Sequence, residues 1–211
     1  ARELGLLEVL LQRAGRLVSK DQLVERLCEW GEEVSNNAIE VYISRLRAKL
    51  QLPFGLTGAQ KRSIAEIEGD MAQESPMLRL LQGDVGAGKT LVALMAMLRA
   101  VEAGAQAALM APTELLARQH LRSFERLCGA AGVPVALLAG SVKGKERRRV
   151  LQGLADGTLP IVVGTHALFQ EGVAFKDLGL AVVDEQHRFG VAQRLMLAEK
   201  GQAADMLVMT A

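Results

Sequence analysis

The 211-residue sequence predicts an α/β domain with a mainly parallel sheet, preceded by a small all-helical segment. From residue 51 onward, apolar runs alternate with helix-like stretches, which is typical of a parallel sheet covered by helices on both faces. A glycine-rich loop ending in Lys-Thr follows the first of these runs directly. Before residue 51, leucines instead recur at helical spacing. We therefore divide the chain into residues 1–50 and 51–211.

Composition excludes several classes of protein. Half of the residues are apolar, which is enough for a sizeable core, and the formal net charge of +1 argues against a uniformly basic nucleic-acid coat. Cys28 and Cys128 lie far apart, so no disulfide framework is implied and a reducing compartment is favoured. Charges at Arg2, Glu3 and Glu8 interrupt the first apolar run, which excludes a signal peptide or membrane span there. We expect a cytoplasmic protein that contacts no membrane.

Residues 1–50 predict three short helices. Gly15 ends the first, Ser19 and Gln22 form a capping box for the second, and Ser35 or Asn36 caps the third. One face of the third helix is apolar, and the other presents Asn37, Val41, Ser44, Arg45 and Ala48. The pattern suits a helix-turn-helix that enters a DNA major groove, with Arg45 reading bases and Arg47 or Lys49 contacting phosphates. An ordinary helical bundle with a solvated basic face fits the pattern equally well.

The run GRLVSKDQLVERLCEWGEEVSNNAIEVYISRLRAKL resembles the winged-helix effector domain of OmpR-type response regulators. That resemblance implies DNA contacts from Val41, Ser44, Arg45 and Arg47. The family's N-terminal sheet and C-terminal wing hairpin have no counterpart here, so the resemblance implies a truncated winged helix. Loss of the wing removes phosphate contacts, and we expect weakened DNA affinity.

Six apolar runs between residues 51 and 211 predict six strands of one sheet. They read MLRLLQ, AQAALMAP, VPVALLAG, PIVVGT, LGLAVVDE and DMLVMTA. Parallel sheets of this kind bind ligands at the carboxyl ends of their strands. The polar motifs of the sequence follow these ends, so we expect the functional site there.

The stretch LLQGDVGAGKT contains the phosphate-loop pattern from Gly83 to Thr90. Gly83, Gly86 and Gly88 allow backbone amides to surround a phosphate, as in nucleotide-binding loops. Lys89 supplies a positive charge to the outer phosphates, and the Thr90 hydroxyl can ligate Mg²⁺. A chance glycine-rich turn is the alternative, which the strand before the loop and the helix after it disfavour.

The stretch LGLAVVDEQH places Asp184 and Glu185 at the end of a strand. Asp184 can hold the Mg²⁺ shell, and Glu185 can orient and deprotonate an attacking water. A surface Asp-Glu pair is the alternative, but an uncompensated carboxylate after a buried strand would be costly. Next to this pair, Gln186 and His187 are interpreted as a relay between nucleotide state and DNA, although a lone histidine is more often structural.

The motifs GDVGAGKT, APTELLARQH, GTHALFQ and DEQHRFG, in this order, resemble the first motor domain of the RecG branch-migration helicases, a family of superfamily 2 DNA translocases. DEQHRFG favours this family over the related transcription-repair coupling factor. The resemblance implies a RecA-like P-loop lobe that uses ATP and Mg²⁺ on branched or duplex DNA, in branch migration, repair and recombination. The loop LPFGLTGAQ resembles the family's adenine-contacting segment, which implies that Phe54 packs near the base and Gln60 hydrogen-bonds its edge.

The same resemblance implies a DNA path along two of the motifs. Its residues would be Pro112, Thr113, Glu114, Thr165 and His166. Helix capping is the alternative role for the two threonines. The basic run KGKERRR, with Lys143, Lys145, Arg147, Arg148 and Arg149, can add phosphate contacts, although a solvated helix face is slightly favoured.

The family implied by these motifs carries a second RecA-like lobe that supplies an arginine to the nucleotide. We expect this chain, as a chimera or fragment without that lobe, to bind ATP with little turnover, because the arginine contributes about 10³- to 10⁵-fold in rate. A DNA-binding transcription regulator of the OmpR type with an accessory nucleotide-binding domain is the alternative function.

Overall fold

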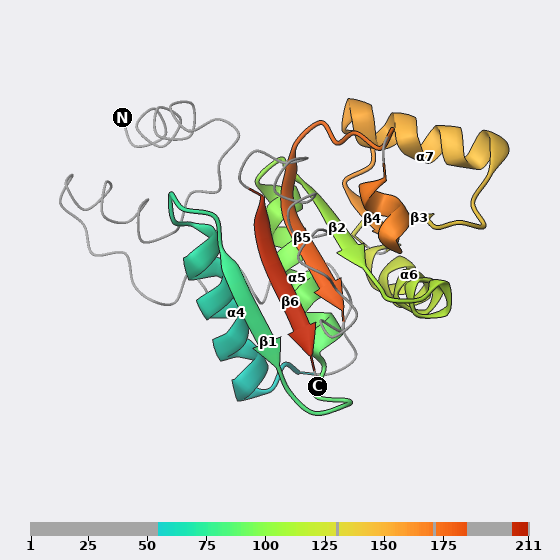
Figure 1. The fold of residues 1–211 in the computed structure, drawn as a ribbon. Coiled ribbons are helices and arrows are strands. Elements are labelled where there is room, and N and C mark those ends of the chain that lie inside the picture. The colour runs from blue at the N-terminus through green and yellow to red at the C-terminus, as the bar shows by residue number, and fades with distance from the viewer. Residues whose placement is uncertain (1–54, 130, 171, 185–203, 211) are drawn as a thin grey trace.

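The computed structural model describes residues 55–129, 131–170, 172–184 and 204–210 (Figure 1). Six strands form one parallel sheet in the order β1-β6-β5-β2-β4-β3. All six predicted strands are confirmed. Their bounds are β1 Leu78–Gln82, β2 Gln106–Met110, β3 Val135–Leu138, β4 Ile161–Gly164, β5 Leu178–Asp184 and β6 Asp205–Thr210.

Four α-helices and one 3₁₀-helix are described around this sheet (Figure 1). They are α4 Gly58–Met71, α5 Lys89–Glu102, α6 Glu114–Gly129, α7 Gly144–Asp156 and η1 His166–Phe169. Thr57 begins α4 with a capping box, in which its hydroxyl accepts from the Gln60 backbone and the Gln60 side chain accepts from the Thr57 backbone. None of the helices in the described ranges is long and apolar enough to span a membrane.

The sheet has a hydrophobic core on each face. Leu109 points into the core formed with α4, α5 and α6, whereas the next residue, Met110, points into the core formed with α7 and η1. This alternation follows from the two-residue period of a strand. Every residue from Leu91 to Leu98 of α5 is buried, because this helix lies between the sheet and α4. The predicted two-layered covering of a parallel sheet is therefore confirmed.

One glycine is required by the close packing of two strands. A Cβ at Gly164, the last residue of β4, would lie 2.1 Å from the carbonyl oxygen of Leu138 at the end of β3. Any larger residue would push these two strand ends apart. Gly164 thereby keeps the carboxyl ends of β3 and β4 close together.

Several predictions fall outside the described residues. These are the three helices of residues 1–50, the DNA contacts Val41, Ser44, Arg45 and Arg47, the base contact Phe54, and the residues Glu185, Gln186 and His187. The described part of the chain therefore contains the α/β domain only.

Candidate nucleotide-binding site

The glycine-rich loop lies at the carboxyl edge of the sheet. Thr210 of β6 is level with Gln82 of β1, and Asp184 of β5 is level with Met209 of β6. Because neighbouring strands lie about 4.8 Å apart, Asp184 is roughly 10 Å across the sheet from the point where β1 enters the loop. The backbone N–H of Gly83 donates to the Thr210 carbonyl at 3.4 Å, which fixes the start of the loop to β6.

Two of the three loop glycines are required by the backbone. Gly86 and Gly88 have φ values of 85° and 82°, a left-handed conformation that other residues rarely adopt. A Cβ at Gly88 would also lie 2.3 Å from Nε2 of Gln60. At Gly83, in contrast, a Cβ would make only ordinary contact with Ala87, so the structure of the loop itself does not demand glycine there.

Lys89 closes the loop and begins α5. Its ammonium donates to the carbonyl of Gly83 and, at 3.0 Å, to the carbonyl of Asp84. A positive charge, free backbone N–H groups and the positive end of the helix dipole thus meet at one place. Thr90, the second residue of the helix, is half-buried beside them. This arrangement suits a phosphate group.

Gln60 connects α4 to the loop. Its Oε1 accepts from the Thr57 backbone at 2.9 Å, and its Nε2 donates to the Ala87 carbonyl at 3.0 Å. The side chain predicted to reach a base is thus already bonded to the loop. Because the amide nitrogen carries two hydrogens, one remains for a ligand.

Asp184 forms a contact that the sequence analysis missed. Its Oδ2 lies 2.7 Å from Nε2 of His120 in α6. His120 is 9% exposed. The motif APTELLARQH did place His120 on the same side of α6 as the start of the helix, because His120 follows Thr113 by two helical turns. Sequence spacing alone did not reveal its partner, which lies 64 residues further along the chain.

The oxygen donors of the site fit Mg²⁺. The Thr90 hydroxyl and the Asp184 carboxylate are hard oxygen ligands, which Mg²⁺ prefers. Within the described ranges, no group of three or more His, Cys, Asp or Glu side chains could hold a metal ion.

In the first predicted DNA-contact segment, residues 112–114, two side chains already form hydrogen bonds within the protein. Thr113 Oγ1 accepts from the Leu116 backbone at 3.3 Å, so the alternative role of this residue as a helix cap is observed. The Glu114 carboxylate accepts from Ser141 and Arg118, which lowers the pKa of that carboxyl. Pro112 is half-buried and Thr113 is exposed.

In the second segment, the two predicted residues differ in exposure. Thr165 is buried, and its backbone N–H donates to the Leu138 carbonyl at 3.3 Å. Its side chain makes no capping bond to η1, so the capping alternative is not observed here. His166 is exposed at the start of η1 and is the more accessible of the two.

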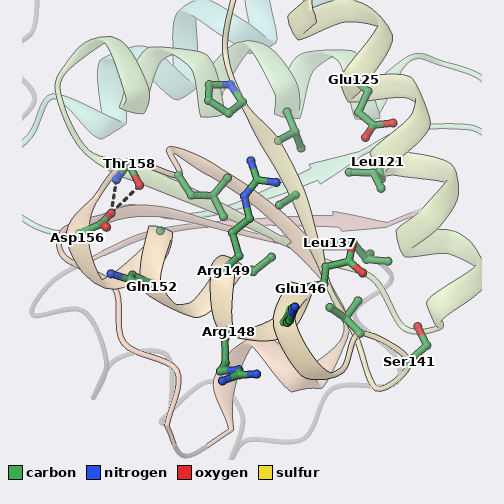
Figure 2. A pocket seen from close by; sticks show the side chains of 18 of the residues that line it. Leu121, Glu125, Leu137, Ser141, Glu146, Arg148, Arg149, Gln152, Asp156 and Thr158 are labelled. Atoms are coloured by element: carbon green, nitrogen blue, oxygen red, sulfur yellow. Dashed lines mark hydrogen bonds between the residues drawn. The ribbon is translucent and has the colours of Figure 1, made fainter.

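The basic run begins the helix that follows β3, which is the outermost strand on one side of the sheet. The glycine-rich loop follows β1, the outermost strand on the other side. Figure 2 shows a groove between α6 and α7 along β3, which Arg148 and Arg149 of the basic run both line. Glu125 and Glu146 line the same groove, so it carries both signs of charge. Lys143 and Lys145 are exposed at the start of α7, as expected for a solvated helix face.

Two family models match the chain. The DEAD/DEAH box helicase model matches residues 57–211, which include the loop, Asp184 and the whole sheet. The chain belongs to the DEAD/DEAH box helicase family. A second model, described as transcriptional regulatory protein, C terminal, matches residues 1–69 and agrees with the resemblance found at the N-terminus. The two matches overlap in α4, which in the structure packs against α5 as part of the DEAD/DEAH box domain.

Curated relatives of this DEAD/DEAH box domain are ATP-dependent DNA helicases named RecG. The protein from Haemophilus influenzae is 56% identical over 164 residues, which cover 76% of this chain and 24% of the relative. The protein from Staphylococcus epidermidis is 51% identical over 183 residues, which cover 85% of this chain and 27% of the relative. The chain thus spans about a quarter of the length of these relatives.

Solved structures show the same fold. A structure of RecG bound to a three-way DNA junction matches with a TM-score of 0.70 and 40% identity, covering 97% of this chain and 25% of that one. The helicase Mss116p bound to single-stranded RNA and AMP-PNP matches with a TM-score of 0.58 at 19% identity, covering 92% and 41%. This second likeness supports the RecA-like fold alone.

Proposed function

We propose that residues 51–211 form the ATP-binding first motor lobe of a RecG-like superfamily 2 DNA helicase or translocase. The observation that carries this proposal is the complete loop from Gly83 to Thr90, placed at the same sheet edge as Asp184. Relatives more than 50% identical to this lobe are ATP-dependent DNA helicases. We place residues 1–50 in a separate winged-helix segment and the protein in the cytoplasm.

Each site residue has a proposed task. Lys89 and the amides of the loop hold the β- and γ-phosphates, while Gln60, together with Phe54, contacts the adenine. Thr90 and Asp184 hold Mg²⁺, which when bound neutralises charge on the phosphates. Glu185 takes the proton of the attacking water. Gln186 and His187 relay the nucleotide state to DNA.

Nucleotide binding by the whole chain tests the proposal. We expect Lys89→Ala to weaken Mg-ADP binding about 10- to 100-fold, because a hydrogen bond to a charged group contributes about 1.5–3 kcal/mol. Isothermal titration calorimetry measures the affinity. Lys145→Ala is the matched control, since this lysine lies exposed on α7, and its affinity should equal that of the wild type. Equal affinities for the wild type and Lys89→Ala would remove the proposal.

DNA is the proposed macromolecular partner, with the path along Pro112, Thr113, Glu114, Thr165 and His166. Because backbone groups and hydroxyls grip phosphates without reading bases, we expect weak, salt-dependent binding that is indifferent to sequence. Fluorescence anisotropy with two unrelated duplexes at several salt concentrations measures it. Slow ATP turnover by the 211 residues alone also stays a prediction, which a steady-state ATPase assay measures.

The second candidate function is transcription regulation, which the family match over residues 1–69 favours. It predicts a sequence-specific footprint at physiological salt that Arg45→Ala abolishes, because Arg45 would read base edges. Nuclease footprinting after selection of preferred sequences from a random pool distinguishes the two. Such a footprint would rank the regulator above the motor.

A further inference from the structure

The contact between His120 and Asp184 joins a motif of the proposed DNA path to the proposed Mg²⁺ ligand. His120 belongs to α6, which begins at Glu114, and Asp184 ends β5. We propose that His120 is a positioning residue, which orients the Asp184 carboxylate so that its second oxygen faces the Mg²⁺ of a bound nucleotide. This inference rests on the proposed function.

Burial makes the contact strong and keeps it in place. The side chains of His120 and Asp184 are 11% and 17% exposed. In such surroundings, a hydrogen bond is weakened less by water than at the surface. The His120 ring also packs against Phe124, with ring centroids 6.3 Å apart, and Phe124 is fully buried. The imidazole therefore cannot turn away without disturbing the core.

The chemistry of the two groups sets the direction of the bond. A carboxylate only accepts hydrogen bonds, so Nε2 of His120 must carry the hydrogen that is donated to Oδ2. This bond leaves Oδ1 of Asp184 for a cation or for a water of its shell. The terminal torsion of an aspartate is otherwise broad, and a ligand already held in one orientation loses less freedom when the metal binds.

The Mg²⁺ dependence of ADP binding tests the proposal without using catalysis. Calorimetric titrations of ADP at a series of Mg²⁺ concentrations give the Mg²⁺ half-saturation for each variant. We expect His120→Leu, which keeps a buried apolar bulk, to raise it about 10-fold, as measured for lost partners of metal ligands. His120→Gln should recover most of the effect, because its amide nitrogen can reach the position of Nε2. ADP affinity in EDTA should be equal in all three proteins.

The controls separate positioning from packing. Cys128→Ala removes buried bulk from the same core at the far end of α6 and leaves the His120 ring and its hydrogen bond in place, so its Mg²⁺ half-saturation should match the wild type. If His120→Leu does not fold, His120→Asn replaces it, because the shorter amide cannot reach Oδ2. An unchanged or lower Mg²⁺ half-saturation in His120→Leu, or an equal shift in His120→Gln, would overturn the inference. A wild type that fails to bind Mg-ADP would instead remove the proposed function itself.

Discussion

At the scale of single residues, Gln106 shows how a buried polar side chain joins separate parts of this fold. Its Nε2 donates to the carbonyls of Leu154 and Leu159, at 3.0 and 2.9 Å. Its Oε1 accepts from the backbone N–H groups of Lys176 and Asp177, at 2.9 and 3.1 Å. One side-chain amide thus hydrogen-bonds backbone groups in three places: the last turn of α7, the segment before β4 and the segment before β5.

We expect Gln106→Leu to destabilise the protein by about 2 kcal/mol or more. The apolar side chain has similar bulk but leaves the Leu159 carbonyl and the Asp177 N–H without the amide, and a buried unsatisfied group costs about 1–3 kcal/mol. The Lys176 N–H and the Leu154 carbonyl keep their bond to each other at 3.0 Å. Chemical denaturation followed by circular dichroism measures the change. Gln152→Leu, on the exposed side of α7, should stay within about 0.5 kcal/mol of the wild type. Equal stability of the two variants would show that water replaces the amide of Gln106.

At the scale of elements, the pairing of β1 with β6 begins at a buried carboxyl group. Asp205, the first residue of β6, accepts from the Met77 backbone at 2.7 Å, and the Met206 backbone donates to the Met77 carbonyl at 2.7 Å. Burial raises the pKa of Asp205 to about 6, with the hydrogen bond from Met77 opposing the shift. The carboxyl group of Asp205 thus holds its proton more tightly in the native state than in the unfolded chain.

The sign of the pH dependence follows from that shift. Between about pH 4 and pH 6, the native state retains a proton that the unfolded state has lost, so the contribution of Asp205 to stability falls as pH rises. The loss is on the order of 2–3 kcal/mol. We expect Asp205→Asn, which keeps an oxygen acceptor without the charge, to gain stability over the wild type from pH 4 to pH 7. Urea unfolding at each pH measures this gain, with exposed Asp177→Asn as the control. A gain that does not grow with pH would contradict the raised pKa.

The elements were predictable from the sequence because their signals are local. LLQGDVGAGKT carries strand, loop and helix start in consecutive residues, and the apolar run LGLAVVD directly marks β5. The pairing of β1 with β6 could not be predicted from the sequence, since it joins residues more than a hundred positions apart and depends on the order of the strands in the sheet. The hydrogen bonds of His120 and Gln106 could not be predicted for the same reason. Each is one polar residue in an otherwise ordinary pattern, and only folding brings its partners near.

At the scale of the whole molecule, one hydrophobic core connects the helix that follows the glycine-rich loop to the end of α6. The largest core cluster contains Cys128 at the end of α6 and most of α5, whose first residue is Lys89 of the loop. Cys128 is fully buried, and burial raises the pKa of its thiol to about 11. Because the thiolate is the reactive form, a labelling reagent reaches Cys128 only when the core opens.

We therefore expect labelling of Cys128 to report on nucleotide binding at a distance. In a Cys28→Ser background, the native protein should react slowly, and Mg-ADP at about 100 times its Kd should slow the reaction about 100-fold. That factor corresponds to about 2.7 kcal/mol of stabilisation when opening is global. Lys89→Ala, whose affinity is expected to be 10- to 100-fold weaker, should show only about 2- to 11-fold protection at the same ADP concentration. Mass spectrometry of alkylated protein follows the rate. If calorimetry shows Mg-ADP binding but labelling stays equally fast, α6 opens locally, and the core does not couple Cys128 to the loop.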